Sequence, residues 1–227
     1  MKKFIIAVMF VFGITSVLFS QNWFVGGSMN LGFTNDSRDE SNRSKEFENR
    51  YINISPEIGY RFSNFDFGIR PIFQYNYLNS DETYFSSQYK TNDSILGFGA
   101  GVFTRLHIVT FFDRLSFLGR FDLDYVFSKS QMEYEMNTET HNTIEAINHN
   151  IGLRFTPIAE FRLTERFSLY SSIIGSIISI GYLNSSETAD YLYGGEASRE
   201  RNSLYLTLPS IYKFSLTDIS FGFYLKF

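Results

Sequence analysis

The sequence predicts an all-β chain: an eight-stranded antiparallel up-and-down β-barrel of the transmembrane type, preceded by a cleaved signal peptide. Three observations support this fold class. Downstream of Gln21 apolar and polar residues alternate with a period of two, which is the period of a β-strand. Short and long connections alternate along the chain, and the chain ends on an aromatic residue. We therefore expect a signal peptide at residues 1–20 and one barrel domain at residues 21–227.

The composition excludes several classes of protein. Aromatic residues make up 19% of the 227 residues, which is far too many for a disordered chain. The absence of cysteine excludes a disulfide framework, and a formal net charge of -4 does not suggest a nucleic-acid partner. Beyond residue 20, no apolar run approaches the roughly 18 residues that would indicate a membrane-spanning helix. If the chain crosses a membrane, it therefore does so with strands.

The first residues are typical of an export signal. Lys2 and Lys3 are followed by an uncharged apolar stretch from Phe4 to Phe19 and by a plausible cleavage edge at Ser20 and Gln21. A membrane anchor is the alternative, but these 16 residues are short for a hydrocarbon core about 30 Å thick.

Eight segments carry the alternation, and most place aromatic or aliphatic residues on one face and charged residues on the other. In the third, Phe65, Phe67 and Ile69 alternate with Asp66 and Arg70. Strands of about 11 to 16 residues exceed the 5 or 6 that are common in soluble sandwiches, and they suit a barrel whose apolar face meets lipid. The segments are residues 23–34, 51–62, 65–77, 96–108, 115–128, 147–161, 167–182 and 202–227.

The connections predict an orientation in the membrane. Those at 63–64, 110–114 and 164–166 are short, whereas those at 35–49, 79–93, 129–145 and 184–201 are long and polar. Outer-membrane barrels have short periplasmic turns and long extracellular loops, so we expect both termini in the periplasm. The long segments hold 16 acidic and 7 basic residues, which predicts an acidic extracellular rim; solvated loops that resist aggregation are its simplest explanation.

The chain ends with Ser220, Gly222, Leu225 and Phe227 in the spacing of the insertion signal of outer-membrane barrels. Such a signal is read in the periplasm by the barrel assembly machinery. Residues 202–214 and 219–227 could form two strands and make nine in all, but a ninth strand would carry the signal outside. We therefore interpret 202–227 as one long descending strand, or its extracellular extension, with a bulge near 215–218.

Four stretches resemble the small "outer membrane protein beta-barrel domain" family of Bacteroidetes-type bacteria. They are WFVGGS, ISPEIGYRFS, FTPIAEFRLTERFSL and SFGFYLKF. The resemblance implies an eight-stranded barrel in the outer membrane of a Gram-negative bacterium, without assigned chemistry for most members.

The inward face should carry a charge network. A two-residue turn at 63–64 places Glu57 opposite Arg70, Arg61 opposite Asp66, and Asn53 opposite Gln74. Six further charges extend the network: Arg105, Arg120, Asp122, Asp124, Arg154 and Glu160. Glycines at 97, 99 and 101 should leave room for bulky inward neighbours such as Arg120. The network is interpreted as a salt-bridged plug, with a selectivity filter or a substrate-binding cluster as the alternative.

The sequence predicts no catalytic, cofactor or metal site. His107, His141 and His149 are too scattered for a metal triad, and His149 has a lipid-facing frame without a serine partner. We therefore expect a non-enzymatic outer-membrane protein with a structural or surface-presenting role, in contact with outer-membrane lipids. A narrow pore for small solutes is the alternative, and a lipid-modifying barrel enzyme is a more distant one.

Overall fold

The fold is taken from a computed structural model, which describes residues 22–40, 43–84, 87–136, 140–172, 177–191, 195–207 and 220–227. The expected signal peptide, residues 1–20, lies outside this part of the chain. The strands are β1 (Trp23–Glu40), β2 (Arg43–Phe62), β3 (Phe65–Tyr84), β4 (Ser87–Phe111), β5 (Leu115–Met136), β6 (Thr140–Arg162), β7 (Phe167–Ser172), β8 (Ile178–Tyr191), β9 (Gly195–Thr207) and β10 (Ser220–Lys226).

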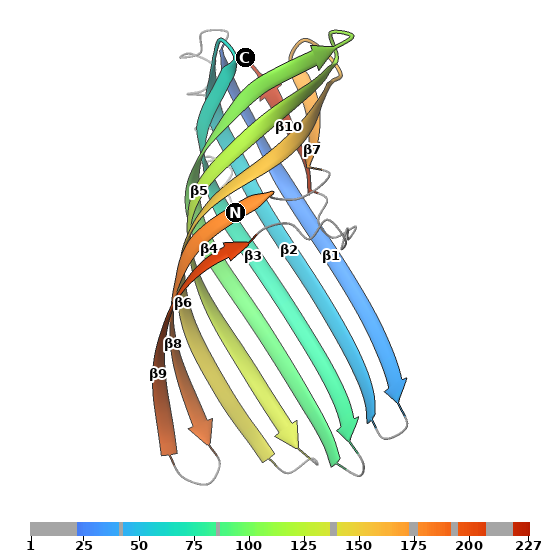
Figure 1. The fold of residues 1–227 in the computed structure, drawn as a ribbon, viewed down its shortest axis with the longest axis vertical. Coiled ribbons are helices and arrows are strands. Elements are labelled where there is room, and N and C mark those ends of the chain that lie inside the picture. Colours follow the sequence, from blue (N-terminus) through green and yellow to red (C-terminus); the bar gives the residue numbers. More distant parts are fainter. Residues whose placement is uncertain are drawn as a thin grey trace, which may run out of the picture.

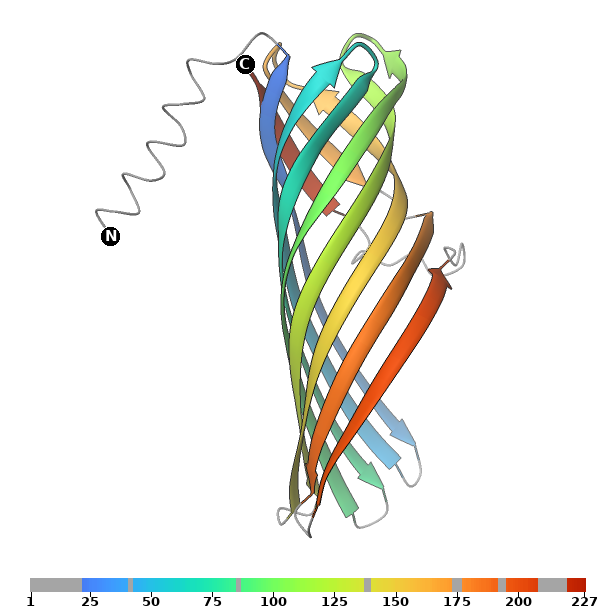
Figure 2. The same cartoon turned by 90° about the vertical axis from the view of Figure 1, so that its left-hand side faces the viewer.

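An eight-stranded antiparallel ring closes at one end of the molecule, as predicted (Figure 1). Each strand from β1 to β6 pairs with the next one. The ring is completed by β7 and β10, since β6 pairs with β7, β7 with β10, and β10 with β1. The short connections and residue 227 lie at this end, which we call the turn end; we call the opposite end the hairpin end (Figure 2).

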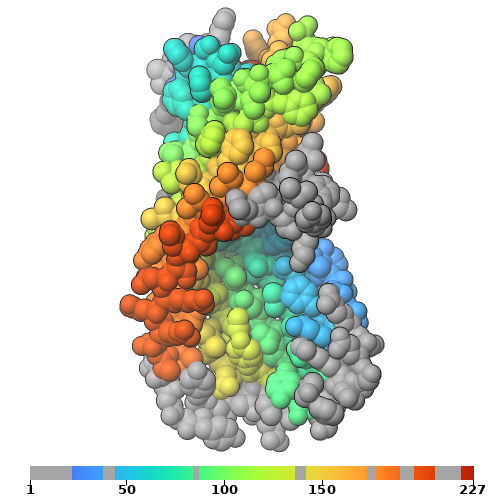
Figure 3. Space-filling model, in the orientation of Figure 1, coloured from blue at the N-terminus to red at the C-terminus, as the bar shows by residue number. Residues whose placement is uncertain are grey.

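The last two predicted strands are each divided in two. β7 and β8 both pair with β6, but β10 pairs with β7 near the turn end and β9 pairs with β8 nearer the hairpin end. Of the predicted strand 202–227, residues 202–207 belong to β9 and residues 220–226 to β10. The expected bulge near 215–218 lies outside the described residues. Figure 3 shows a hollow between β9 and β1, through which side chains of the opposite wall are visible.

The described residues of the long polar connections lie in strands rather than in loops, which corrects the prediction. Their residues continue the ladders of the β1–β2, β3–β4, β5–β6 and β8–β9 hairpins, and the β1–β2 ladder reaches Glu40 opposite Arg43. An antiparallel ladder satisfies the backbone whether side chains are polar or apolar. The apolar alternation therefore marked only part of each strand in these four hairpins.

The molecule is apolar outside and polar inside. Ile69 is 59% exposed, Phe67 54% and Val102 52%, whereas Asp66 and Arg105 are buried. Among the described residues there is no helix long and apolar enough to cross a membrane. This distribution is opposite to that of a soluble sandwich, where the apolar face is buried.

The β1–β2 hairpin provides a test of the strand extension. Thr34 and Asn49 are directly opposite in the ladder. Since the natural chain has no cysteine, a Thr34→Cys/Asn49→Cys variant should form one disulfide on mild oxidation, because directly paired residues lie within disulfide reach. The measurement is mass and thiol titration of the refolded protein. A Thr34→Cys/Glu46→Cys control places the second thiol on the other face about 10 Å along the strand and should stay reduced. Equal oxidation of both variants would indicate a loop.

Candidate functional site in the charged lumen

The ten charged residues predicted to form the lumen network lie on β2 to β6, in the half of the barrel near the turn end. Five are arginines and five are carboxylates, so the set is neutral when all are ionised. Eight are 7% exposed or less. The side chains of the other two, Arg61 and Arg154, are 18% and 40% exposed.

Nine of the ten are joined in one continuous series of ion pairs, in which positive and negative groups alternate. We call it the ion-pair chain. It runs in the order Arg61, Asp66, Arg105, Glu57, Arg120, Asp122, Arg70, Asp124 and Arg154.

Glu57 lies at the centre of the ion-pair chain, and its side chain has no exposed surface. Its Oε1 accepts a hydrogen bond of 2.6 Å from Nη1 of Arg120, and Oε2 accepts one of 3.5 Å from Nη2 of Arg105. The hydroxyl of Tyr170 also donates to Oε1, at 3.3 Å. Two cations and a phenol thus compensate one buried carboxylate, as a charge removed from water requires.

The expected pair between Glu57 and Arg70 does not form, and the prediction is wrong on this point. Arg70 instead reaches across β4 to β5, where its Nη2 lies 2.7 Å from Asp124 and 3.1 Å from Asp122. The register of the three strands explains this path. Gly101 of β4 lies between Arg70 and Asp124 and has no side chain to block the arginine.

The three glycines of β4 serve other neighbours than expected. A Cβ at Gly101 would meet the carboxylate of Asp124, and one at Gly97 would meet the side chain of Gln74. A Cβ at Gly99 would meet Val126 and the backbone of β5. The room is therefore used by these side chains rather than by Arg120.

The pair nearest the turn end follows the predicted register. Arg61 and Asp66 are directly opposite, and the guanidinium donates to both carboxylate oxygens at 2.6 and 2.8 Å. The ring of His107 lies 3.2 Å from the same carboxylate, and Arg105 lies 3.7 Å from it. Asn53 also faces Gln74 as expected.

An aromatic cage surrounds Arg105, and the sequence analysis missed it. The guanidinium carbon lies 4.7 Å from the ring centre of Phe24, 4.9 Å from Phe103, 5.0 Å from Tyr224 and 5.6 Å from Tyr170. These four rings belong to a buried cluster with Leu118 and Ile158. All six interrupt the polar frame of their strands, and this interruption was the available signal.

Glu160 is the tenth charge and is not part of the ion-pair chain. It is 1% exposed, and neither of its carboxylate oxygens accepts a hydrogen bond from a described residue. Arg61 and Lys226 are close enough to interact with it electrostatically. With five arginines and four acids, the ion-pair chain alone has a net charge of +1, which Glu160 balances.

The remaining predicted positions lie in the wall. Gly222 packs under the ring of Tyr170, while Leu225 and Phe227 are 36% and 39% exposed. Nδ1 of His149 hydrogen-bonds the hydroxyl of Tyr125 at 2.7 Å. Ser220 begins β10, and the side chain of His141 lies outside the described part. Among the described residues no group of three His, Asp or Glu could hold a metal ion.

Comparison with known proteins returned structural similarities only. No family model and no curated protein matches the chain, so the family resemblance stays a prediction. The ferric yersiniabactin uptake receptor FyuA of Yersinia pestis is similar at 10% identity and a TM-score of 0.44, over 83% of this chain and 31% of that one. The translocator domain of the autotransporter NalP from Neisseria meningitidis aligns at 11% identity and a TM-score of 0.20, covering 97% and 96% of the two chains. The β domain of the Bordetella autotransporter BrkA aligns at 10% and 0.21, covering 91% and 98%.

The partners of Glu57 can be tested by double-mutant cycles. Glu57→Gln should destabilise the refolded barrel by about 3 kcal/mol, because Arg120 loses its charged partner in a buried site. Replacing Arg120 by Met in the same chain should recover much of this loss, giving a coupling energy above about 1 kcal/mol. The measurement is urea unfolding in lipid vesicles.

The same cycle with Arg70→Met is the control. Since Arg70 contacts Asp122 and Asp124, its coupling with Glu57 should be less than half as large. A larger coupling of Glu57 with Arg70 than with Arg120 would support the ion pair between Glu57 and Arg70 that the sequence predicted.

Proposed function

We propose that this protein is a non-enzymatic integral protein of the outer membrane, a barrel with a closed lumen that presents its hairpin end to the exterior. The apolar outward face supports the membrane location, because Phe, Ile and Leu side chains about half exposed to water would otherwise form a large exposed apolar surface. Outer-membrane lipids are the partners of that face.

The orientation follows from the connections and charges. Short turns lie at one end together with residue 227, and the hairpin extensions carry most of the acidic residues. Outer-membrane barrels have short turns on the periplasmic side, so the turn end is periplasmic and the hairpin end extracellular. The acidic extensions, rather than long loops, form the external surface.

The buried centre of the ion-pair chain carries the proposal of a closed lumen. The side chains of Glu57 and Arg105 are 0% and 1% exposed, and the four rings of the cage fill the space around them. A water-filled pore would leave its lining charges hydrated and exposed. The interior of an eight-stranded barrel is just wide enough for side chains to fill it.

A narrow pore for small solutes is the second candidate. It is favoured by the hollow between β9 and β1 in Figure 3 and by the partial exposure of Arg154 at one end of the ion-pair chain. The more distant candidate is a lipid-modifying enzyme, which mass analysis of lipopolysaccharide incubated with the protein would reveal.

Conductance in a planar bilayer tests the closed lumen. The natural protein should give no stable single-channel steps, whereas a Glu57→Ala/Arg105→Ala variant should conduct, because two side chains at the centre of the ion-pair chain are removed. Heat-modified gel mobility establishes that each barrel is folded.

The matched control removes an ion pair from the outward surface. Lys129 and Glu145 lie 2.8 Å apart with side chains 52% and 50% exposed. A Lys129→Ala/Glu145→Ala variant should therefore give no single-channel steps. Stable steps from the natural protein would support the pore instead.

Deletion of Phe227 tests the assembly signal. Phe227 is 39% exposed at the end of the wall, so its contribution to the finished barrel is at most about 1.5 to 3 kcal/mol. If the barrel assembly machinery recognises the terminal residues, the deletion should reduce the amount in the outer membrane much more than the stability of barrel refolded in micelles. Equal amounts in the membrane at matched synthesis would contradict the signal.

A further inference from the structure

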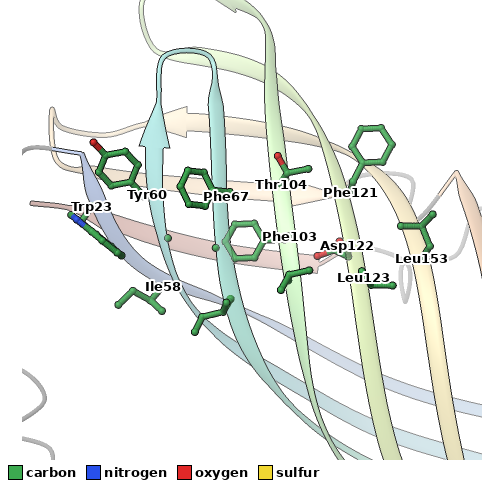
Figure 4. Close-up of a pocket in the computed structure, with 14 residues that line it drawn as sticks. Trp23, Ile58, Tyr60, Phe67, Phe103, Thr104, Phe121, Asp122, Leu123 and Leu153 are labelled. Atoms are coloured by element: carbon green, nitrogen blue, oxygen red, sulfur yellow. The ribbon is translucent and has the colours of Figure 1, made fainter.

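A groove crosses the outward face of the barrel wall, from β1 to β6 (Figure 4). It encloses about 740 Å³ and is lined almost entirely by apolar side chains. Val102 and Thr104 of β4 lie in its middle, and larger residues of the neighbouring strands flank them: Phe67 on β3, with Phe121 and Leu123 on β5.

The groove arises from one small residue in an aromatic row. The ladders place Trp23, Tyr60, Phe67, Thr104 and Phe121 side by side across five strands. Thr104 is the only residue of this row without a ring, so the surface is lowered at its position. Its hydroxyl donates to the backbone oxygen of Asp66 at 3.0 Å, which satisfies the polar atom and leaves the methyl group for an apolar occupant.

The groove also leads from one edge of the wall toward its middle. Trp23 is the first residue of β1 and Tyr60 is two residues from the end of β2, so both lie at the turn end. At the other side of the groove, Leu123 is the ninth residue of β5, and Leu153 lies nine residues before the end of β6.

The extent of the groove along the membrane normal matches the thickness of one leaflet. Five steps between neighbouring strands span about 24 Å at a spacing of about 4.8 Å. With strands tilted by about 45°, a path across them rises by about 17 Å, while half of a bilayer's hydrocarbon core is about 15 Å.

The end of the groove nearest the turn end has the chemistry of a membrane interface. The rings of Trp23 and Tyr60 meet edge to face with centres 5.4 Å apart, and the hydroxyl of Tyr60 accepts a hydrogen bond of 3.1 Å from the amide of Asn22. Rings with a polar edge are favoured at the level of lipid headgroups. The groove thus has an interfacial aromatic pair at one end and an apolar lining along the rest of its length.

We infer that this groove is a binding site for one acyl chain of a phospholipid from the leaflet at the turn end. The inference rests on the proposed membrane location, because the groove is continuous with the lipid-facing surface. Trp23 and Tyr60 hold the region next to the headgroup, and the chain lies over Val102 and Thr104 between Phe67 and the β5 side chains.

The single tryptophan of the protein provides the measurement, since Trp23 lines the groove. The probe is a phosphatidylethanolamine with a dibrominated acyl chain, which quenches tryptophan fluorescence at short range. Titrated into detergent-refolded barrel, it should quench Trp23 with saturation.

Two variants of the same strand separate a site from general contact with lipid. Val102→Phe fills the floor and should raise the probe concentration at half-quenching at least about threefold. Leu96→Phe adds a ring at an outward position that is 50% exposed and outside the groove, and it should leave the titration unchanged. Both replaced side chains face outward, and heat-modified gel mobility checks that both variants fold.

Equal half-quenching concentrations in the natural protein and both variants, or quenching without saturation, would overturn the acyl-chain site. Failure of the membrane location would appear differently. In that case vesicles made of the brominated lipid would not quench Trp23 at all, whereas a barrel without the site would still be quenched in vesicles.

Discussion

The interior of this barrel depends on the burial of Glu57, a carboxylate whose side chain has no exposed surface. Removing an ionised group from water costs several kcal/mol, and the cost is offset only when cations and hydrogen-bond donors surround it. Arg120 and Arg105 provide the charge, and Tyr170 provides a further donor. Arg120 also pairs with Asp122, and Arg105 also pairs with Asp66. Through these shared acids the ion pairs continue to Arg154 at one end and to Arg61 at the other.

All cations of the ion-pair chain are arginines, and the geometry shows why. Arg120 contacts both Glu57 and Asp122, and Arg70 contacts both Asp122 and Asp124. A planar guanidinium with five donors can hold two carboxylates at once, whereas an ammonium group acts as a single point of charge. The rings around Arg105 add favourable contacts with a cation that has few hydrogen-bond partners.

The charged interior and the apolar wall are two consequences of the same strand alternation. Inward residues of β2 to β6 hold the charges, while outward residues of the same strands form a surface suited to lipid. The acyl-chain groove belongs to the outward set. It appears where Thr104 stands in a row of aromatic residues, and the small size of this one side chain lowers the surface there.

Much of the fold could be predicted from the sequence, because alternation, turn spacing and length are local properties. They determined the antiparallel barrel, the ring of eight, the inward and outward faces of the first six predicted strands, and the facing pair of Arg61 and Asp66 across a two-residue turn. The extent of the hairpins was not predictable in this way, because polar residues continue a ladder as well as apolar ones do.

Only the tertiary structure decided which acid each long arginine side chain reaches. Arg70 crosses a strand over Gly101, and its partner therefore does not follow from the register of neighbouring strands alone. Tyr170 reaches Glu57 across 113 residues of sequence, because closure of the ring brings β7 and β2 to the same lumen. The sequence by itself thus determined the wall of the barrel, whose pairing is set by adjacent segments, and the closed ring determined its interior, where side chains from distant strands meet.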